Sequence, residues 1–272
     1  MNVLLITSYV RTGVRIGMIQ VTDLVTLRLC PYRFYLEKIQ KKKVPTTQEM
    51  YLGTVYHKIA EETVRRESQI IAELKPGCRS RQVFDLLYME YCRVIRNVIL
   101  RRKLKLTSLN IDCESLLQEL REFYKEAALQ KALSVKKALE KKEEGIIVGD
   151  VEYYIEDTDL GLLGRVDRIE IHGDVLLPVE IKTVEKKRPA FSEVLQLAGY
   201  ALLLERERCT AVKRGIIEYP STRILVDIPD NLKEYIMKLR DHALQILGGE
   251  VPEKVRTDKC DRCHFFETCW QR

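Results

Sequence analysis

This chain of 272 residues has no run of apolar residues approaching the roughly 18 needed to cross a bilayer, so we expect no membrane span. Its N-terminal stretch, Val3–Val10, lacks the basic flank and the small-residue cleavage site of a signal peptide. Internal repeats and low-complexity segments are also missing. The hydrophobic fraction of 46% and the charged fraction of 32% exclude disordered, collagen-like and membrane-bundle proteins. What is left is a globular protein with one large domain, or with one domain that carries an inserted subdomain.

Eight cysteines without a secretion signal indicate a reducing compartment, the cytoplasm, where clustered cysteines bind metal more often than they form disulfides. Three of them, Cys260, Cys263 and Cys269, are spaced as metal ligands near the C-terminus. A four-coordinate site needs one more ligand. Cys30 is the best candidate because the proline after it interrupts a predicted helix, and His264 is the alternative in a zinc site.

The net charge of +6 is unevenly distributed along the chain. Residues 1–145 carry a net charge of +10, and residues 146–272 carry −4. A basic half beside an acidic half suggests a track for a polyanion next to a site that bears carboxylates. Lys41–Lys43 and Arg101–Lys103 are basic runs that could follow such a polyanion, and the alternative is that they are ordinary solvated helix faces.

The spacing of apolar residues changes at Gly145 from a helical period to the alternation of strands. The sequence therefore predicts an α/β core preceded by helices. The predicted helices cover residues 22–29, 32–39, 48–71, 81–103, 110–142, 191–207 and 231–247, and the predicted strands cover 146–155, 162–171, 175–183, 211–218 and 223–228. We divide the chain into N-terminal helices (1–61), a helical insertion (62–145), an α/β core (146–250) and a cysteine-bearing tail (251–272).

Two predicted neighbouring strands carry carboxylates that can form one site. Asp167 lies near the end of the first strand, and Glu180 and Lys182 lie on one face of the next, since side chains alternate along a strand. Two carboxylates on rigid strands make a hard oxygen site for Mg²⁺ or Mn²⁺. A lysine beside them can orient the attacking water or stabilise charge that grows on a phosphoryl group. A surface Glu-x-Lys without function is the alternative.

Two helical pairs could join this site. Gln196 and Tyr200 are four residues apart, so they share one helix face and can reach one target together. Upstream, His57 and Glu61 also share a helix face, and Gly53 one turn before the histidine would allow a close approach. A hydrogen-bonded core histidine is the alternative for His57.

Taken in order, Gly-x-x-x-His, Asp, Glu-x-Lys and Gln-x-x-x-Tyr resemble the RecB-like branch of the PD-(D/E)xK nucleases. The resemblance covers about residues 20–61 and 146–228, and it implies a restriction-endonuclease-like mixed-sheet core. It departs from the family pattern at Val166, which stands where proline is common. The resemblance implies that a divalent metal is bound by His57, Asp167, Glu180 and the backbone carbonyl of Ile181.

The same resemblance implies the roles of the neighbouring side chains. Lys182 would be the catalytic lysine, while Gln196 and Tyr200 would steady it or contact DNA. A distant N-terminal cysteine with the C-terminal spacing C-x₂-C-x₅-C is similar to the iron–sulfur nucleases of this group, so Cys30, Cys260, Cys263 and Cys269 would hold a cluster. The form expected is [4Fe–4S], with [2Fe–2S] and zinc left open.

Length and the lack of a Walker A motif separate this chain from the helicase-linked members of the group. A small chain of this kind resembles the CRISPR-associated RecB-like exonucleases. That resemblance implies cleavage of single-stranded DNA ends, most commonly 5′→3′, in protospacer processing with the CRISPR integrase proteins, and it leaves a homo-oligomer open. The alternative is a non-catalytic iron–sulfur subunit that binds DNA or acts as a scaffold in an adaptation or DNA-repair complex.

Overall fold

The structure is a computed structural model that describes residues 17–74, 77–141, 147–182, 184–219 and 222–270. The N-terminal stretch Val3–Val10, the predicted strand start at residue 146 and the predicted strand end at residue 183 lie outside the described residues. Within the described residues, no helix is both long and apolar enough to span a membrane.

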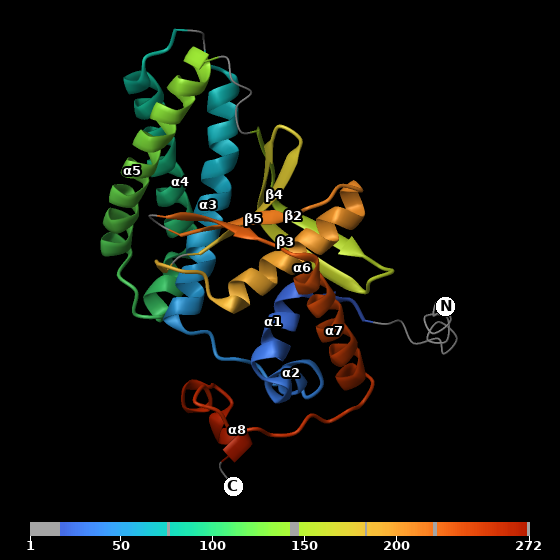
Figure 1. Ribbon diagram of the computed structural model, residues 1–272. Coiled ribbons are helices and arrows are strands. Elements are labelled where there is room, and N and C mark those ends of the chain that lie inside the picture. The colour runs from blue at the N-terminus through green and yellow to red at the C-terminus, as the bar shows by residue number, and fades with distance from the viewer. Residues whose placement is uncertain (1–16, 75–76, 142–146, 183, 220–221, 271–272) are drawn as a thin grey trace.

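Three long helices stand side by side on one flank of the molecule (Figure 1). They are α3 (Gln48–Ala72), α4 (Ser80–Ser108) and α5 (Cys113–Lys141). Their apolar stripes, at three- and four-residue steps, meet in a core of their own that includes Leu87, Ile95 and Leu120. The helical periodicity therefore predicted these helices correctly. The predicted boundary between residues 61 and 62 falls inside the continuous helix α3.

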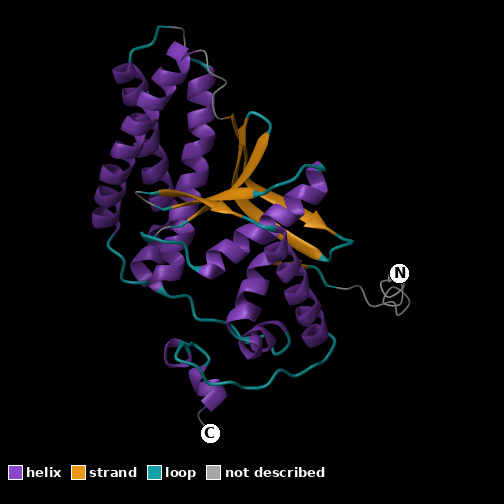
Figure 2. Ribbon diagram, viewed as in Figure 1, coloured by secondary structure: helices purple, strands orange, loops and turns teal. Residues whose placement is uncertain are grey.

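The sheet is mixed, and one long strand, β3, pairs with three of the others (Figure 2). The strand order is β1-β3-β4-β5-β6, and β2 also pairs with β3. Strand β1 runs parallel to β3, and β4 runs parallel to β5. The other pairings are antiparallel. The six strands are β1 (Ile19–Gln20), β2 (Ile147–Asp157), β3 (Leu162–His172), β4 (Val175–Ile181), β5 (Arg214–Glu218) and β6 (Arg223–Asp227).

Strands β3 and β4 form the hairpin that the sequence predicts. Their connection contains Gly173 at φ 58°, a left-handed conformation that glycine adopts without steric cost. The strand β1, of two residues, is too short to give an alternation pattern, and the sequence analysis missed it. The five predicted strands of the core are otherwise confirmed within a few residues at their ends.

Helices α1 (Val21–Leu29), α6 (Phe191–Arg208) and α7 (Asp230–Leu247) pack with the sheet around a second core. A Cβ atom at Gly199 would lie 2.6 Å from Val21 Cγ1, so this glycine is what lets α1 and α6 approach closely. Helix α2 (Pro31–Lys38) begins directly after Cys30, whose extended backbone ends α1, as the Cys30-Pro31 step predicts.

The C-terminal tail returns to the N-terminal helices. It holds a 3₁₀ turn, η2 (Cys260–Arg262), and the short helix α8 (Phe266–Trp270), which Figure 1 shows below α1 and α2. Lys254 Nζ lies 5.1 Å from the centroid of the Tyr32 ring, so the tail contacts α2 directly. The α/β fold with a mixed sheet and a helical N-terminal region is therefore confirmed, while the division into four segments stays a prediction.

Candidate metal centre

Asp167 on β3 and Glu180 on β4 face each other across the antiparallel ladder. The register pairs Arg168 with Val179, so the next step places the two acids opposite one another. Both side chains are buried. Asp167 Oδ2 accepts a hydrogen bond of 2.7 Å from the backbone N–H of Ile181, while burial raises the pKa of Asp167 to about 7. The adjacency that strand alternation predicts is therefore present.

Glu180 is a buried carboxylate with one oxygen satisfied and one left over. Its Oε1 accepts from Lys182 Nζ at 2.7 Å and from Gln196 Nε2 at 2.8 Å. Its Oε2 is buried without a hydrogen-bond partner in the described part of the chain. Burial, together with the nearby charge of Asp167, raises the pKa of Glu180 to about 7. An orphaned oxygen of this kind is costly unless a cation or a proton meets it.

Helix α6 supplies the two polar side chains that the i, i+4 spacing predicts. Gln196 Nε2 donates to Tyr200 Oη at 2.9 Å, and Gln196 Oε1 accepts from Lys182 Nζ at 3.3 Å. A Cβ atom at Gly164 would lie 2.8 Å from a carbon of the Tyr200 ring, so this glycine on β3 makes room for the ring. The described structure thus brings Lys182, Gln196 and Tyr200 together around Glu180.

His57 reaches the acids from helix α3. Its Nδ1 lies 3.6 Å from Asp167 Oδ1. Burial lowers the pKa of His57, and this favours the neutral imidazole that binds metal ions. A Cβ atom at Gly53 would meet no described atom within 4 Å, so no described part of the chain makes a close approach there, and the role of this glycine stays a prediction. Glu61 shares the helix face but pairs with Lys58 and Arg65 instead, at 2.6 and 2.9 Å.

Glu152 on β2 is a site residue that the sequence analysis missed. The ladder pairs Val151 with Arg168 and Tyr153 with Val166, which sets Glu152 opposite Asp167. The register of β2 shifts between Val148 and Val151, and Glu152 has a φ of 51°. A bulge of this kind changes the direction of a side chain locally. The alternation of apolar and polar residues along the strand does not predict it.

His57, Glu152 and Asp167 each offer a ligand atom, and these atoms all lie within 4.8 Å of one another. An imidazole with two carboxylates is a donor set suited to Mn²⁺ and also acceptable to Mg²⁺. Glu180, predicted as a ligand by resemblance, lies next to this group with its free oxygen. We call His57, Glu152, Asp167 and Glu180 the acidic site.

The four cysteines predicted to bind a cluster line one small pocket between the chain ends. Cys30 contributes from the junction of α1 and α2, Cys260 and Cys263 from η2 and the residue after it, and Cys269 from α8. Cys30 Sγ accepts a hydrogen bond of 3.4 Å from the backbone N–H of Arg33. In the described residues the cysteine sulfurs form no group as tight as the three ligands of the acidic site.

The other cysteines and the predicted basic runs lie elsewhere. Cys78 and Cys113 pack against the core of the helical flank, and Cys209 is exposed at the end of α6. All three residues of Lys41–Lys43 are exposed, as a phosphate-binding run requires, while Arg101 Nη1 lies 3.7 Å from Glu62. These positions leave both interpretations of the basic residues open.

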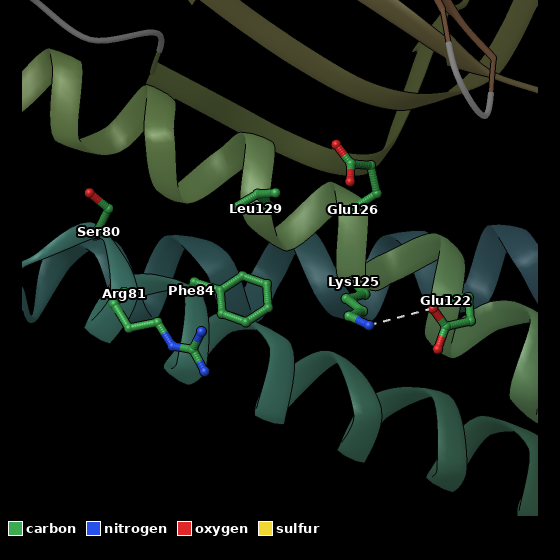
Figure 3. Close-up of a pocket in the computed structure, with 7 residues that line it drawn as sticks. All are labelled: Ser80, Arg81, Phe84, Glu122, Lys125, Glu126 and Leu129. Atoms are coloured by element: carbon green, nitrogen blue, oxygen red, sulfur yellow. Dashed lines mark ion pairs between the residues drawn. The ribbon is translucent and has the colours of Figure 1, made fainter.

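A wider hollow lies between α4 and α5, away from the acidic site (Figure 3). Its volume is about 530 Å³, and Lys125 Nζ lies 3.7 Å from Glu122 on its wall. The lining residues are Ser80, Arg81, Phe84, Glu122, Lys125, Glu126 and Leu129. These lining residues include no histidine or cysteine that could bind a metal ion. The hollow is wide, but its residues do not indicate a reacting centre.

The chain belongs to the PD-(D/E)XK nuclease superfamily, whose family model matches residues 19–270. The match spans the acidic site and the cysteine tail. No curated protein matches the chain. Among solved structures, the chain is similar to the one titled "Crystal structure of SSO0001", with 18% identity over 62% of this chain and 80% of that chain, at a TM-score of 0.29. Membership of the superfamily identifies the chain as a metal-dependent nuclease with a nucleic-acid substrate.

Proposed function

We propose that the protein is a metal-dependent DNA exonuclease that acts on single-stranded DNA ends and processes protospacers for CRISPR spacer acquisition. The observation that carries the catalytic part is the acidic site, where Glu180 Oε2 is buried without a hydrogen-bond partner among the described residues, beside the three-ligand group that contains Asp167. The finer assignment to single-stranded ends and to the CRISPR integrase proteins is supported by the ordered motifs and the cysteine spacing.

The donor set fits a divalent cation. Burial lowers the pKa of His57 and so favours its neutral form, Asp167 and Glu180 are buried close together, and each acid has a raised pKa that a cation would lower again. A bound Mn²⁺ or Mg²⁺ supplies Lewis-acid chemistry, because it polarises the scissile phosphate and lowers the pKa of a bound water. We propose His57, Glu152, Asp167, Glu180 and the carbonyl of Ile181 as the residues that hold it.

Lys182 is the side chain that acts on the water in this proposal. Glu180 Oε1 and Gln196 Oε1 both accept from its ammonium group, so its position is fixed from two elements. A fixed ammonium can orient an attacking water and stabilise negative charge that develops on the phosphate. Tyr200 acts through Gln196, and burial raises the pKa of Tyr200 so that its hydroxyl stays protonated. Gln196 and Tyr200 are thus positioning residues.

The experiment compares linear single-stranded DNA, labelled at either end, with circular single-stranded DNA of the same sequence. We expect Mn²⁺-dependent release of short products from the linear substrate and an intact circle, with no cleavage in EDTA. Asp159→Asn is the control, since Asp159 is a highly exposed acid on the turn before β3. Cleavage of the circle would replace the exonuclease proposal by an endonuclease. Tight binding without cleavage would favour the non-catalytic subunit.

We also propose that Cys30, Cys260, Cys263 and Cys269 hold an iron–sulfur cluster, with [4Fe–4S] favoured. The support is that these four of the eight cysteines share one pocket although Cys30 is far from the others in sequence. Phe265 and Trp270 also line the pocket, and an apolar wall would limit the access of water to a cluster. Iron and sulfide analysis of anaerobically purified protein tests this, and one zinc ion in a colourless protein would overturn it.

The CRISPR role is tested by adding integrase proteins to the nuclease with a duplex that carries single-stranded ends. We expect the ends to be trimmed and the trimmed product to be integrated more efficiently than the untrimmed one. If the wild type improved integration no more than an Asp167→Asn variant does, protospacer processing would be removed from the proposal. The proposed nuclease activity would not be affected by that result.

A further inference from the structure

Arg165 on β3 is an arginine beside the acidic site that no part of the proposed chemistry uses. Its Nη1 lies 3.2 Å from Glu152 Oε2. The side chain of Arg165 is 66% exposed, whereas that of Glu152 is 18% exposed. A guanidinium that is open to solvent is therefore paired with a carboxylate of the three-ligand group.

The strand geometry sets the position of this arginine. Arg165 lies two residues before Asp167, so the two side chains share a face of β3. Glu152 stands opposite Asp167 in the ladder, and Arg165 pairs with Tyr154 two residues further along β2. The guanidinium is therefore next to the acids and open to solvent, so an anionic group from outside can reach it.

The pair between Arg165 and Glu152 is open to water on the side of the guanidinium, which screens it, although Glu152 is only 18% exposed. Ion pairs with such solvent access change an equilibrium by about fivefold or less. A divalent cation that shares Glu152 with His57 and Asp167 competes for the same carboxylate and also repels the guanidinium. Arg165 therefore leaves Glu152 readily when that carboxylate takes a cation.

We propose that Arg165 is a positioning residue for the DNA phosphate next to the reacting centre, held on Glu152 until a divalent cation binds there. The proposal rests on the proposed nuclease function. A released guanidinium can hold a phosphate through two parallel N–H donors, which a lysine cannot do. The consequence is an ordered assembly, in which the metal-loaded protein offers a phosphate contact that the metal-free protein withholds.

The first test is a titration with Mn²⁺ in the absence of DNA, in which electron paramagnetic resonance measures the concentration of the free ion. Arg165→Gln should bind Mn²⁺ about three to five times more tightly than the wild type, because the competing cation is gone. Glu152→Gln should bind more weakly, and Glu152→Gln combined with Arg165→Gln should match Glu152→Gln alone. The control is Arg206→Gln, another exposed arginine, which pairs with Asp157 on β2 at 3.0 Å.

The second test measures the binding of a labelled single-stranded oligonucleotide by fluorescence anisotropy, in Ca²⁺ or in EDTA. In Ca²⁺, Arg165→Gln should weaken binding about tenfold and lower the salt slope by roughly one phosphate contact. In EDTA, the variant and the wild type should bind alike, since the wild-type guanidinium is then occupied by Glu152.

Each outcome decides the proposal. Equal Mn²⁺ affinities of the wild type and Arg165→Gln would overturn it, as would the same loss of DNA binding in Ca²⁺ and EDTA, which would indicate a general phosphate contact. A wild-type protein that binds Mn²⁺ and DNA in this coupled way but cuts neither linear nor circular DNA would contradict the proposed function and leave the coupling intact.

Discussion

Glu180→Gln should make the metal-free protein more stable while it removes activity. The substitution keeps the shape of the side chain and deletes a buried charge whose Oε2 has no partner in the described structure. An amide oxygen in place of Oε1 can still accept from Lys182 and Gln196. The loss is therefore confined to the charge and to the ligand oxygen.

The magnitude follows from the pKa of Glu180. Burial and Asp167 raise this pKa from 4.5 to about 7. When the pKa of an acid is higher in the folded state than in the unfolded state, the acid destabilises the folded protein. This destabilisation grows as the pH rises from the pKa of the unfolded state to the pKa of the folded state. This rise in the pKa corresponds to about 3 kcal/mol of lost folding stability above pH 7. An amide nitrogen at the unpartnered position costs about 1 kcal/mol, so the net gain should be about 2 kcal/mol.

The assay is urea denaturation in EDTA at pH 4.5 and pH 8. Glu180→Gln should exceed the wild type by about 2 kcal/mol at pH 8 and fall below it by up to about 1 kcal/mol at pH 4.5, where the folded-state carboxyl is protonated and only the cost of the amide remains. Added Mn²⁺ should stabilise the wild type more than the variant, since binding to the folded state adds stability.

Glu193→Gln is the matched control, with the opposite expected sign. Glu193 is also buried, but its pKa is lowered, because hydrogen bonds from Lys186, Tyr219 and the backbone N–H of Ala190 outweigh its burial. This variant should lose stability at pH 8. If Glu180→Gln lost as much stability as Glu193→Gln in EDTA, the carboxylate of Glu180 would not be the uncompensated charge that the metal site requires.

Three further predictions concern the cluster, the sheet and the basic run. Cys30→Ser should bleach a brown protein and lower its melting temperature, since the proposed cluster would close a loop of more than 200 residues, worth roughly 5 kcal/mol in the chain-entropy estimate; Cys209→Ser should keep the visible absorption spectrum. Glu170→Gln should cost about 3 kcal/mol at pH 7 and progressively less below pH 4.5 in urea denaturation, because neighbouring guanidinium groups outweigh burial and hold the pKa of Glu170 at about 2. Neutralising Lys41–Lys43 should flatten the salt dependence of DNA affinity about equally for all sequences, and an unchanged slope would make the run a solvated surface.

The parts of the acidic site and its surroundings that lie on regular elements could be predicted from the sequence. Strand alternation with a short turn brings Asp167 opposite Glu180, and the helical period puts Gln196 and Tyr200 on one face. These are local rules with a fixed period, so sequence alone is enough to apply them.

Glu152 could not be predicted in the same way. Its place in the site depends on a register shift and a positive φ in β2, which are decided by how β2 pairs with β3. The alternation of apolar residues gives no sign of either. The pairing of Glu61 could not be predicted either. The helical period places its carboxylate on the face of His57, but Lys58 and Arg65 form ion pairs with it instead.

The rate of cleavage of end-labelled single-stranded DNA as a function of Mn²⁺ concentration tests the central claim most directly, with wild type and Asp167→Asn measured side by side. Asp167 belongs to the three-ligand group and lies opposite Glu180, so its carboxylate is central to the acidic site. We predict a rate that saturates with Mn²⁺ for the wild type and falls by at least about a hundredfold for the folded variant. Cleavage by Asp167→Asn at the wild-type rate, or cleavage by the wild type in EDTA, would contradict the assignment of the acidic site.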